Sequence, residues 1–379
     1  MTHYSHKDDD TSALKKLVEL SRFYGGDSNY VLAGGGNTSW KNDEVIYVKA
    51  SGFKLGSITP EGFVKMHLKK LENIWIKQYA ADPAARENEV LRDLKKAKFL
   101  GEEHKRPSVE VLLHSLIPLR FVVHTHPALV NGLTCSVEGR AAVERIFGTK
   151  ALWIPVTDPG YTLAKVVKDA IDEHLQADNN FPQIIFIENH GVFVAGDSPE
   201  EIHTIYKNIM RVLQSEIQEE PDTTIMDISE SEKTEALSRI RSLYEQKTHI
   251  AAFRTPSLMK LMETGEAEKA FQYAFTPDHI VYFGYKPLYV RTVHELPPAV
   301  KQYEKEDGRK PRIILVHGIG AFACNTSPHT TALAQELFID DIKIAVYSKS
   351  FGGFSFMPKE NNEFIRNWEA EKYRASLDE

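Results

Sequence analysis

The sequence predicts an α/β protein with a mixed central β-sheet flanked by helices and a smaller α/β extension at the C-terminal end. Over residues 11–220, short runs typical of strands alternate with amphipathic helical patterns. Over residues 221–245 the composition becomes acidic and helical, which indicates a boundary. A length of 379 residues leaves room for both parts. We therefore expect a first domain over residues 1–220 and an extension of unknown role over residues 221–379.

The elements of the first domain follow from apolar spacing and from cap residues. Thr59 and Pro60 suit the N-cap and first position of a helix, and Ser198 and Pro199 suit the start of a longer one. The expected helices cover residues 11–24, a segment from 60 onward, part of 80–105, 106–116, 137–147, 161–175 and 199–218. The expected strands cover residues 43–50, 121–126, 151–156 and 183–196, and a glycine-rich turn precedes the first of them.

The extension contains one predicted strand–helix–strand unit. It consists of the run PRIILVHGIGAFACN, a helix around residues 330–340 and the strand KIAVYS. Its GIGAF turn lacks the full GxGxxG fingerprint, and no acidic residue follows about 20 residues later on a second strand end. We therefore expect no bound nucleotide, although a nucleotide-binding oxidoreductase fragment remains an alternative. No internal repeat is apparent from the sequence.

Composition excludes several classes of function. The net charge of −7 and the pI of about 6.1 give no electrostatic support for binding nucleic acid or an anionic membrane. No apolar run approaches the roughly 20 residues that cross a bilayer, and the polar N-terminus is unlike a targeting presequence. Cys135 and Cys324 form no CxxC pattern. We expect a cytoplasmic protein.

Two histidines in the run RFVVHTHPALV are the strongest chemical signal. The segment FVVHTH is typical of a strand, so His124 and His126 project from the same face, and Pro127 ends the strand beside them. Two imidazoles in this arrangement suit a divalent metal. The alternative is a pair of strand-end histidines that bind only water.

A third histidine supports the metal interpretation. His190 lies in IIFIENHGVFVAG, where Asn189 and Gly191 indicate a tight turn between two apolar runs. Three neutral imidazoles at strand ends would form a catalytic type of zinc site with open positions. The alternative is a turn residue that bonds only to its own backbone.

Glu110 is the candidate acid or base. It precedes His114 by four residues on the helix SVEVLLHSL, just before the histidine-bearing strand. A carboxylate beside a dication can act as a ligand or as a base. Spacing alone favours the alternative, a solvated glutamate in the first turn of a helix. We expect His114 to pack or to support the site rather than to bind metal.

The segment Gly34–Ser39, GGGNTS, is a donor-rich turn. Consecutive glycines such as Gly36 let backbone N–H groups converge on an anion, and Asn37 and Thr38 add neutral donors. The Ser51–Gly52 turn could add a second set of donors. No GK[ST] follows, so this is not a Walker loop, and the simplest alternative is an ordinary hairpin turn.

Taken together, these motifs resemble the class II aldolase/adducin superfamily. The runs GGGNTS, VKASG, PSVE, HTHP and NHGVFVAG occur in the family's order over about residues 11–215. The longer chain, with a C-terminal segment ending in FIRNWEAEKYR, is most similar to the aldolase half of bifunctional rhamnulose-1-phosphate aldolase/alcohol dehydrogenase proteins. We expect this chain to carry that half alone.

The resemblance implies a site. It implies a divalent metal, with Zn²⁺ the first choice and Mn²⁺ or Co²⁺ as alternatives, held by His124, His126 and His190, and it implies Glu110 as acid/base. The residues implied in substrate phosphate binding, or adjoining it in the donor turn, are Gly36, Asn37, Thr38, Ser51, Gly52 and Ser108. Val109 replaces a second serine of the family, and Ser51 replaces a threonine. No residue aligns with the family's tyrosine proton donor, although Tyr161 is available.

The implied activity is metal-dependent retro-aldol cleavage of a phosphorylated ketose, similar to rhamnulose 1-phosphate, into dihydroxyacetone phosphate and an aldehyde. The glutamate of the PSVE run favours an aldolase over the related 4-epimerases, and a dehydratase of the same superfamily is a further alternative. A non-catalytic adducin-like binding module is the alternative of a different class. The resemblance also implies a homo-oligomer, commonly a tetramer.

Overall fold

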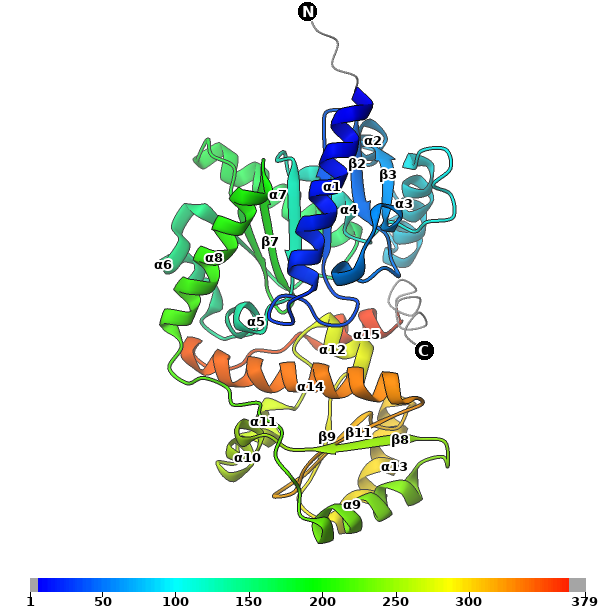
Figure 1. The fold of residues 1–379 in the computed structure, drawn as a ribbon, viewed down its shortest axis with the longest axis vertical. Coiled ribbons are helices and arrows are strands. Elements are labelled where there is room, and N and C mark those ends of the chain that lie inside the picture. Colours follow the sequence, from blue (N-terminus) through cyan, green and yellow to red (C-terminus); the bar gives the residue numbers. More distant parts are fainter. Residues whose placement is uncertain (1–5, 368–379) are drawn as a thin grey trace, which may run out of the picture. The chain divides into compact units, whose positions relative to one another are not determined.

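The computed structural model describes residues 6–367, and its contacts divide the chain into two compact units (Figure 1). Unit 1 comprises the residues up to Val130 together with Arg140–Gln214, and unit 2 comprises Asn131–Gly139 together with the residues from Ser215 onward. The first residues of the polar N-terminus and residues 368–374 of the FIRNWEAEKYR run lie outside the described range. Among the described residues, no helix combines the length and the apolarity that crossing a membrane requires.

Unit 1 and the helices at its boundary follow the predicted alternation closely. The helices are α1 (His6–Gly25), α2 (Leu68–Ile76), α3 (Pro83–Ala97), α4 (Val111–Leu116), α5 (Ala128–Thr134), α6 (Gly139–Phe147), α7 (Tyr161–Ala177) and α8 (Pro199–Glu216). The strands are β1 (Asn37–Lys41), β2 (Val45–Lys49), β3 (Phe63–His67), β4 (Phe121–Thr125), β5 (Ala151–Ile154), β6 (Ile184–Ile187) and β7 (Gly191–Gly196). Part of the predicted glycine-rich turn is thus strand β1.

The strands of unit 1 form the predicted mixed sheet, in the order β3-β2-β1-β4-β7-β6-β5. Neighbours are antiparallel except β5 and β6, which are parallel. Strand β4 is therefore central, between β1 and β7. The expected mixed α/β sheet flanked by helices is confirmed, and its centre is the strand that bears two of the histidines.

Helices cover both faces of this sheet. On one face lie α1 and α8 (Figure 1), since Ser21 of α1 bonds Thr38 of β1 and Tyr206 of α8 bonds Thr125 of β4. On the other face, apolar residues of α2, α4 and α7 share one core with β2, β6 and β7. The first face is called the α1 face below, and the second the α4 face.

The helix predicted from Thr59 and Pro60 is wrong. A short 3₁₀ turn covers Pro60–Gly62 and is followed at once by strand β3. Phe63, Val64 and Met66 are buried in this strand, which pairs with β2 at the edge of the sheet. Pairing with β2 satisfies the backbone hydrogen-bonding groups of the segment and buries these side chains. The stabilisation from this tertiary packing outweighs the local preference of Thr59 and Pro60 for the start of a helix.

Unit 2 contains a second, smaller α/β arrangement. Its helices are α9 (Glu230–Leu243), α10 (Pro256–Glu263), α11 (Ala267–Ala270), α12 (Pro277–Phe283), α13 (Leu296–Asp307), α14 (Pro328–Ser348) and α15 (Lys359–Asn367). Its strands are β8 (His249–Phe253), β9 (Leu288–Val290), β10 (Ile313–Val316) and β11 (Gly320–Asn325), in the order β8-β11-β10-β9.

Two expectations for unit 2 are wrong. The run PRIILVHGIGAFACN forms a hairpin of β10 and β11, and KIAVYS continues α14 instead of forming a strand. Ile344, Ala345 and Val346 are buried within this long helix, whose buried residues occupy most of its surface. A short apolar run in such a helix cannot be distinguished from a strand by periodicity. The strand order of unit 2 corresponds to that of β4 to β7 in unit 1.

Candidate metal centre

The three histidines lie together at one end of the central strands of unit 1. The Nε2 atoms of His124 and His126 are 2.9 Å apart, and those of His124 and His190 are 3.3 Å apart. Nitrogens held about 2.0–2.1 Å from a tetrahedral zinc are themselves about 3.3 Å apart. The ligand nitrogens of the three histidines all lie within 4.8 Å of one another. The donor set and its spacing therefore fit a divalent cation.

Local hydrogen bonds orient these rings. His124 is fully buried, stacks on Phe193, and its Nδ1 lies 3.0 Å from the carbonyl oxygen of Val192. A ring that donates from Nδ1 to a carbonyl turns an unprotonated Nε2 to the other side, as metal-binding histidines do. The backbone N–H of His126 donates to the carbonyl of Tyr30 at 3.1 Å. Backbone contacts thus fix the positions of His124 in β4 and of His126 just after the strand.

The turn between β6 and β7 delivers the third histidine. Asn189 has a φ of +54°, a left-handed conformation that asparagine tolerates better than most residues. The next residue is His190, whose N–H donates to the carbonyl of Ile187 at 3.1 Å. At Gly191, a Cβ atom would lie 2.5 Å from the oxygen of Thr125 and 2.7 Å from the ring of His126. Only glycine lets this turn approach β4 so closely.

Glu110 completes the cluster. It is the N-cap residue of α4 and is 5% exposed, so the alternative of a solvated first-turn glutamate does not apply. Its Oε2 lies 3.4 Å from Nε2 of His124 and its Oε1 3.5 Å from Nε2 of His190. Oε1 is buried and has no hydrogen-bond partner among the described residues. A metal or a substrate proton would satisfy this buried oxygen, which has no partner and lies beside the imidazole of His190.

Asn37 links Glu110 to a buried hydrogen-bond network that the sequence did not predict. Its Nδ2 donates to Glu110 Oε2 at 2.6 Å, and its Oδ1 is bonded to Nε2 of His114. The carboxylate can only accept, so the amide oxygen must face His114, whose Nε2 is then the donor. Nδ1 of His114 is 2.7 Å from Oγ of Ser39. The chain from Ser39 through His114 and Asn37 therefore holds Glu110 in place.

Burial lowers the pKa values of two basic side chains in and beside this network. Burial, with His124 and Lys41 nearby, holds the pKa of His114 well below its ordinary value, so the ring is neutral. Burial also lowers the pKa of Lys41 to about 7, although Asp197 opposes this shift. The Lys41 Nζ donates to the carbonyl of His114 at 2.8 Å. The spacing of Glu110 and His114, four residues apart on one helix face, was the sequence signal that could have linked them in this network.

The donor turn divides between the two faces of the sheet. Asn37 is paired with His124 across β1 and β4, so these side chains share the α4 face. Thr38 points to the α1 face, where its hydroxyl bonds Ser21 Oγ at 2.7 Å and is fully buried. The expectation that Thr38 binds substrate is therefore wrong, because successive strand residues point to opposite faces. At Gly36, φ is +67° and a Cβ would lie 2.8 Å from the oxygen of His124.

The other predicted phosphate residues lie side by side at the end of β2. The backbone N–H of Ser51 donates to the backbone carbonyl of Arg106, and the backbone N–H of Ser108 donates to the backbone carbonyl of Lys49. These two bonds bring the serines together. Gly52 has a φ of +93° and is exposed. The hydroxyl of Ser108 accepts from the N–H of Glu110 at 3.3 Å. Ser108 thus adjoins the catalytic candidate, and binding of phosphate here stays a prediction.

A second support for β4 lies on the α1 face. Tyr206 of α8 is buried, and its hydroxyl lies 2.9 Å from Oγ1 of Thr125 and donates to the carbonyl of Val123 at 3.2 Å. Thr125 is the last residue of β4 and stands between His124 and His126. The tyrosine therefore anchors the strand from behind, a role for which the sequence offered no signal beyond helical spacing.

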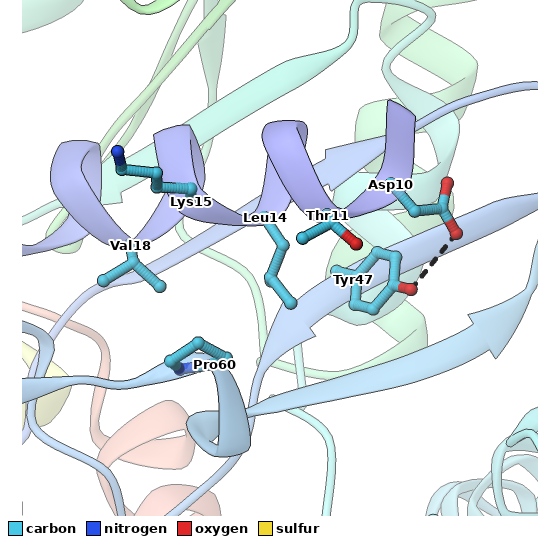
Figure 2. A pocket seen from close by; sticks show the side chains of 7 residues that line it. All are labelled: Asp10, Thr11, Leu14, Lys15, Val18, Tyr47 and Pro60. Atoms are coloured by element: carbon cyan, nitrogen blue, oxygen red, sulfur yellow. Dashed lines mark hydrogen bonds between the residues drawn. The ribbon is translucent and has the colours of Figure 1, made fainter. Parts of the chain in front are cut away.

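A cavity of about 290 Å³ opens on the α1 face (Figure 2). It is lined by Asp10, Thr11, Leu14, Lys15, Val18, Tyr47 and Pro60. The Tyr47 hydroxyl donates to Asp10 Oδ2 at 3.2 Å, and Lys65 pairs with the same oxygen at 2.9 Å. Tyr47 is paired with Trp40, on the face opposite His124. This cavity is therefore separate from the histidine cluster.

Unit 2 contains its own group of buried titratable side chains. His279 lies 3.3 Å through Nε2 from Asp340 and 3.3 Å through Nδ1 from Asp341. The two aspartates raise the pKa of His279 against burial, and burial raises the pKa of Asp341 to about 7. The carboxylates contact opposite nitrogens of the ring, so the ligand atoms do not converge on one point. This arrangement fits an internal ion pair and not a metal site.

Comparison with known proteins places the first domain in a family. Residues 15–216, more than half of the chain, match the model of the Class II Aldolase and Adducin N-terminal domain. The chain belongs to the class II aldolase/adducin family, as its motifs predicted.

Three proteins to which parts of the chain are similar share 11–27% of their residues with it. The "Uncharacterized oxidoreductase YuxG" of Bacillus subtilis (strain 168) is 24% identical over 415 residues, covering 96% of this chain and 58% of that protein. The N-terminal class II aldolase domain of a conserved protein from Thermoplasma acidophilum is 27% identical, with 57% of this chain and 95% of that chain covered and a TM-score of 0.45. An L-fuculose 1-phosphate aldolase from Glaciozyma antarctica PI12 is 11% identical, with 57% and 76% covered and a TM-score of 0.37. This chain thus spans less than two thirds of the curated relative.

Proposed function

We propose that this protein is a divalent-metal-dependent aldolase that cleaves a phosphorylated ketose, similar to rhamnulose 1-phosphate, into dihydroxyacetone phosphate and an aldehyde. The observation that carries the proposal is the clustering of three Nε2 atoms, with Oε2 of Glu110 3.4 Å from that of His124 and Oε1 3.5 Å from that of His190. Zn²⁺ is the first choice of metal, with Mn²⁺ or Co²⁺ as alternatives.

The residues of the chain divide the remaining work. His124, His126 and His190 would hold the metal, which when bound supplies Lewis-acid polarisation of the ketose carbonyl. As the C3–C4 bond breaks, the C4 hydroxyl gives its proton to water and becomes the aldehyde, the electron pair of the bond stays on C3, and C3 is protonated by a carboxyl group that has taken up a proton from water. Oε1 of Glu110 is the group that would deliver the proton to C3, because Asn37 occupies Oε2.

Binding and orientation of the substrate fall to the turns at Asn37, Ser51, Gly52 and Ser108. The two serines adjoin each other and Ser108 adjoins Glu110, so a phosphate held there would place the sugar beside the carboxylate. Such positioning lowers the entropic part of the barrier. A homo-oligomer, with a tetramer as the form implied by the family, is part of this proposal and is tested by light scattering after gel filtration.

The experiment compares purified protein with its variants on a panel of ketose phosphates. Rhamnulose 1-phosphate, fuculose 1-phosphate and ribulose 5-phosphate are supplied, and dihydroxyacetone phosphate is measured by its enzymatic reduction. We expect product from one of the 1-phosphates, loss of activity with a chelator, and recovery with Zn²⁺, Mn²⁺ or Co²⁺. Glu110→Gln should lower kcat by about 10²–10⁴-fold, and His124→Ala should abolish metal binding.

Matched controls separate these effects from general damage. Glu87→Gln alters a half-buried glutamate, and His104→Ala alters an exposed histidine of the same unit, and both should leave activity unchanged. An isomeric pentulose phosphate, or a product that has lost water, would replace the aldolase with an epimerase or a dehydratase. A metal-free protein whose stability is unchanged in His124→Ala would instead support a non-catalytic binding module.

A further inference from the structure

We propose that unit 2 contains a second copy of the half of unit 1 that carries the three histidines, and that this copy has lost its metal ligands. The original half runs from β4 to α8 and the copy from β8 to α14. The strand order β4-β7-β6-β5 recurs as β8-β11-β10-β9, with antiparallel, antiparallel and parallel neighbours in the same sequence. The inference concerns the metal position, so it does not depend on which reaction the protein catalyses.

The hairpins of the two halves have the same register. In β6–β7, Ile187 is paired with Gly191 across the turn. In β10–β11, Val316 is paired with Gly320. Both turns therefore contain three residues, and every later pair along the two hairpins corresponds at a constant offset in numbering.

The turns also have the same conformation. Their middle residues, Asn189 and Gly318, have φ values of +54° and +76°. The N–H of the third turn residue donates to the last carbonyl of the preceding strand, at 3.1 Å for His190 and 3.0 Å for Ile319. In both hairpins, the backbone N–H of the first turn residue donates to a backbone carbonyl of the neighbouring parallel strand at 2.9 Å. Ile319 thus occupies the position of His190.

The glycines after these turns face the same obstacle. A Cβ on Gly191 would lie 2.5 Å from the oxygen of Thr125, and a Cβ on Gly320 would lie 2.6 Å from the oxygen of Phe253. These oxygens belong to β4 and β8, the strands that correspond in the sheet order. The close approach that brings the turn to the metal ligands in unit 1 is therefore retained in unit 2.

The ligand-bearing strand is matched residue by residue. His124 is paired with Phe193 across β4 and β7, and Ala252 is paired with Phe322 across β8 and β11. The two phenylalanines are themselves equivalent in the hairpins. Ala252 therefore occupies the position of His124, and the residue two further along corresponds to His126.

The sequences agree once the register is known. The hairpin and helix start of unit 1 reads PQIIFIENHGVFVAGDSP, and that of unit 2 reads PRIILVHGIGAFACNTSP. Each ends at a Ser-Pro pair that begins a long helix, Ser198 before α8 and Ser327 before α14. The similarity is interrupted at the turn, where ENH is replaced by HGI.

The substitutions remove the metal chemistry. The ligand positions of His124, His126 and His190 are occupied in the copy by Ala252, Arg254 and Ile319. Two alkyl side chains and a guanidinium offer no lone pair to a cation. Within the described part of the chain, the histidines of unit 1 are the group of His, Cys, Asp and Glu side chains that converges for a metal. The copy retains the backbone of a metal site without its ligands.

The test restores the three imidazoles. The variant A252H/R254H/I319H and the wild-type chain are loaded with Co²⁺ and passed through a desalting column, and the metal content and visible absorption are measured. We expect two Co²⁺ per chain in the variant against one in the wild type. A folded variant with no more Co²⁺ than the wild type would overturn the proposal. A wild type without Co²⁺ would overturn the metal centre of unit 1, while a gain of one in the variant would still support the copy.

Two further variants guard against misleading results. In E263H/K269H/K301H, three histidines replace exposed residues of unit 2, and the Co²⁺ content should stay that of the wild type. The reciprocal variant H124A/H126R/H190I installs the residues of the copy in unit 1. It should fold, as judged by circular dichroism and gel filtration, and bind no Co²⁺. If the restored variant fails to fold, the reciprocal variant decides, and its own failure to fold would contradict the equivalence.

Discussion

The side-chain amide of Asn37 donates a hydrogen bond to Glu110 Oε2 over 2.6 Å, and the two residues are brought together from β1 and from the start of α4. This contact assigns the oxygens of the carboxylate different surroundings. Oε2 is held by an amide, while Oε1 lies beside His190 without a hydrogen-bond partner among the described residues. The asymmetry makes Glu110 suited to proton transfer from one defined oxygen.

Asn37→Ala should therefore lower kcat. A hydrogen bond to a charged group contributes about 1.5–3 kcal/mol, so we expect a loss of about 10–100-fold if the bond positions Glu110 for catalysis. Steady-state kinetics with the member of the ketose phosphate panel that yields product provides the measurement. An increase in KM at constant kcat would instead assign Asn37 to phosphate binding. Ser51→Ala, in the neighbouring turn, is the control that should raise KM alone.

Tyr206→Phe should destabilise unit 1 by about 1–2 kcal/mol, because it removes a buried hydroxyl that bonds Thr125 and the carbonyl of Val123. Urea unfolding followed by circular dichroism measures the change. A double-mutant cycle with Thr125→Val isolates the contact between the two side chains. Additive effects of the two substitutions would show that this contact does not anchor β4.

Gly191→Ala and Gly320→Ala should both lower stability, the second also through backbone strain at its φ of +146°, and they should differ in their effects on metal binding. Each methyl group would meet a backbone oxygen at 2.5 or 2.6 Å, and such overpacking costs about 1–3 kcal/mol. Only the substitution at Gly191 also meets His126, at 2.7 Å. Calorimetric titration with Zn²⁺ should show weaker binding for Gly191→Ala alone. Gly265→Ala, at an open position with φ of +74°, serves as the control for backbone strain without a clash.

Lys41→Met should change how stability depends on pH. Burial lowers the pKa of Lys41 from 10.5 to about 7, so between these values the unfolded chain binds a proton that the folded chain does not. The contribution of Lys41 therefore makes the wild type more stable as the pH rises from about 7 to 10, by up to about 1.4 kcal/mol per pH unit. Unfolding free energies at pH 7.5 and 9.5 should show a smaller rise in the variant. An unchanged pH slope would contradict the low pKa.

The metal-ligand candidates could be chosen from the sequence because local patterns determine them. An HxH pair on a strand must point to one face, and a polar turn between two apolar runs must bring His190 to the end of the same sheet. The same period of two shows why Thr38 was assigned to the wrong side. Once β1 is known to begin at Asn37, Thr38 has to face α1.

The surroundings of Glu110 could not be read from the sequence. Its burial, its bond to Asn37 and the bond from Asn37 to His114 join segments more than seventy residues apart. No local pattern encodes which of two polar residues will meet when a helix packs on a sheet. The short run KIAVYS was misassigned for a related reason, since a helix buried over most of its surface accepts β-branched residues that would otherwise favour a strand.

By itself, the sequence determined the family, the alternation of strands and helices in unit 1 and the three histidines, because each follows from periodicity or from short motifs. The tertiary structure decided which oxygen of Glu110 is held by Asn37, which face of the sheet each donor occupies, and that the half-domain occurs twice. The repeat was hidden because strand register and turn geometry conserve backbone contacts, which many side chains satisfy. The two halves differ at the ligand positions, and the histidines at those positions were the pattern by which the site was found in the sequence.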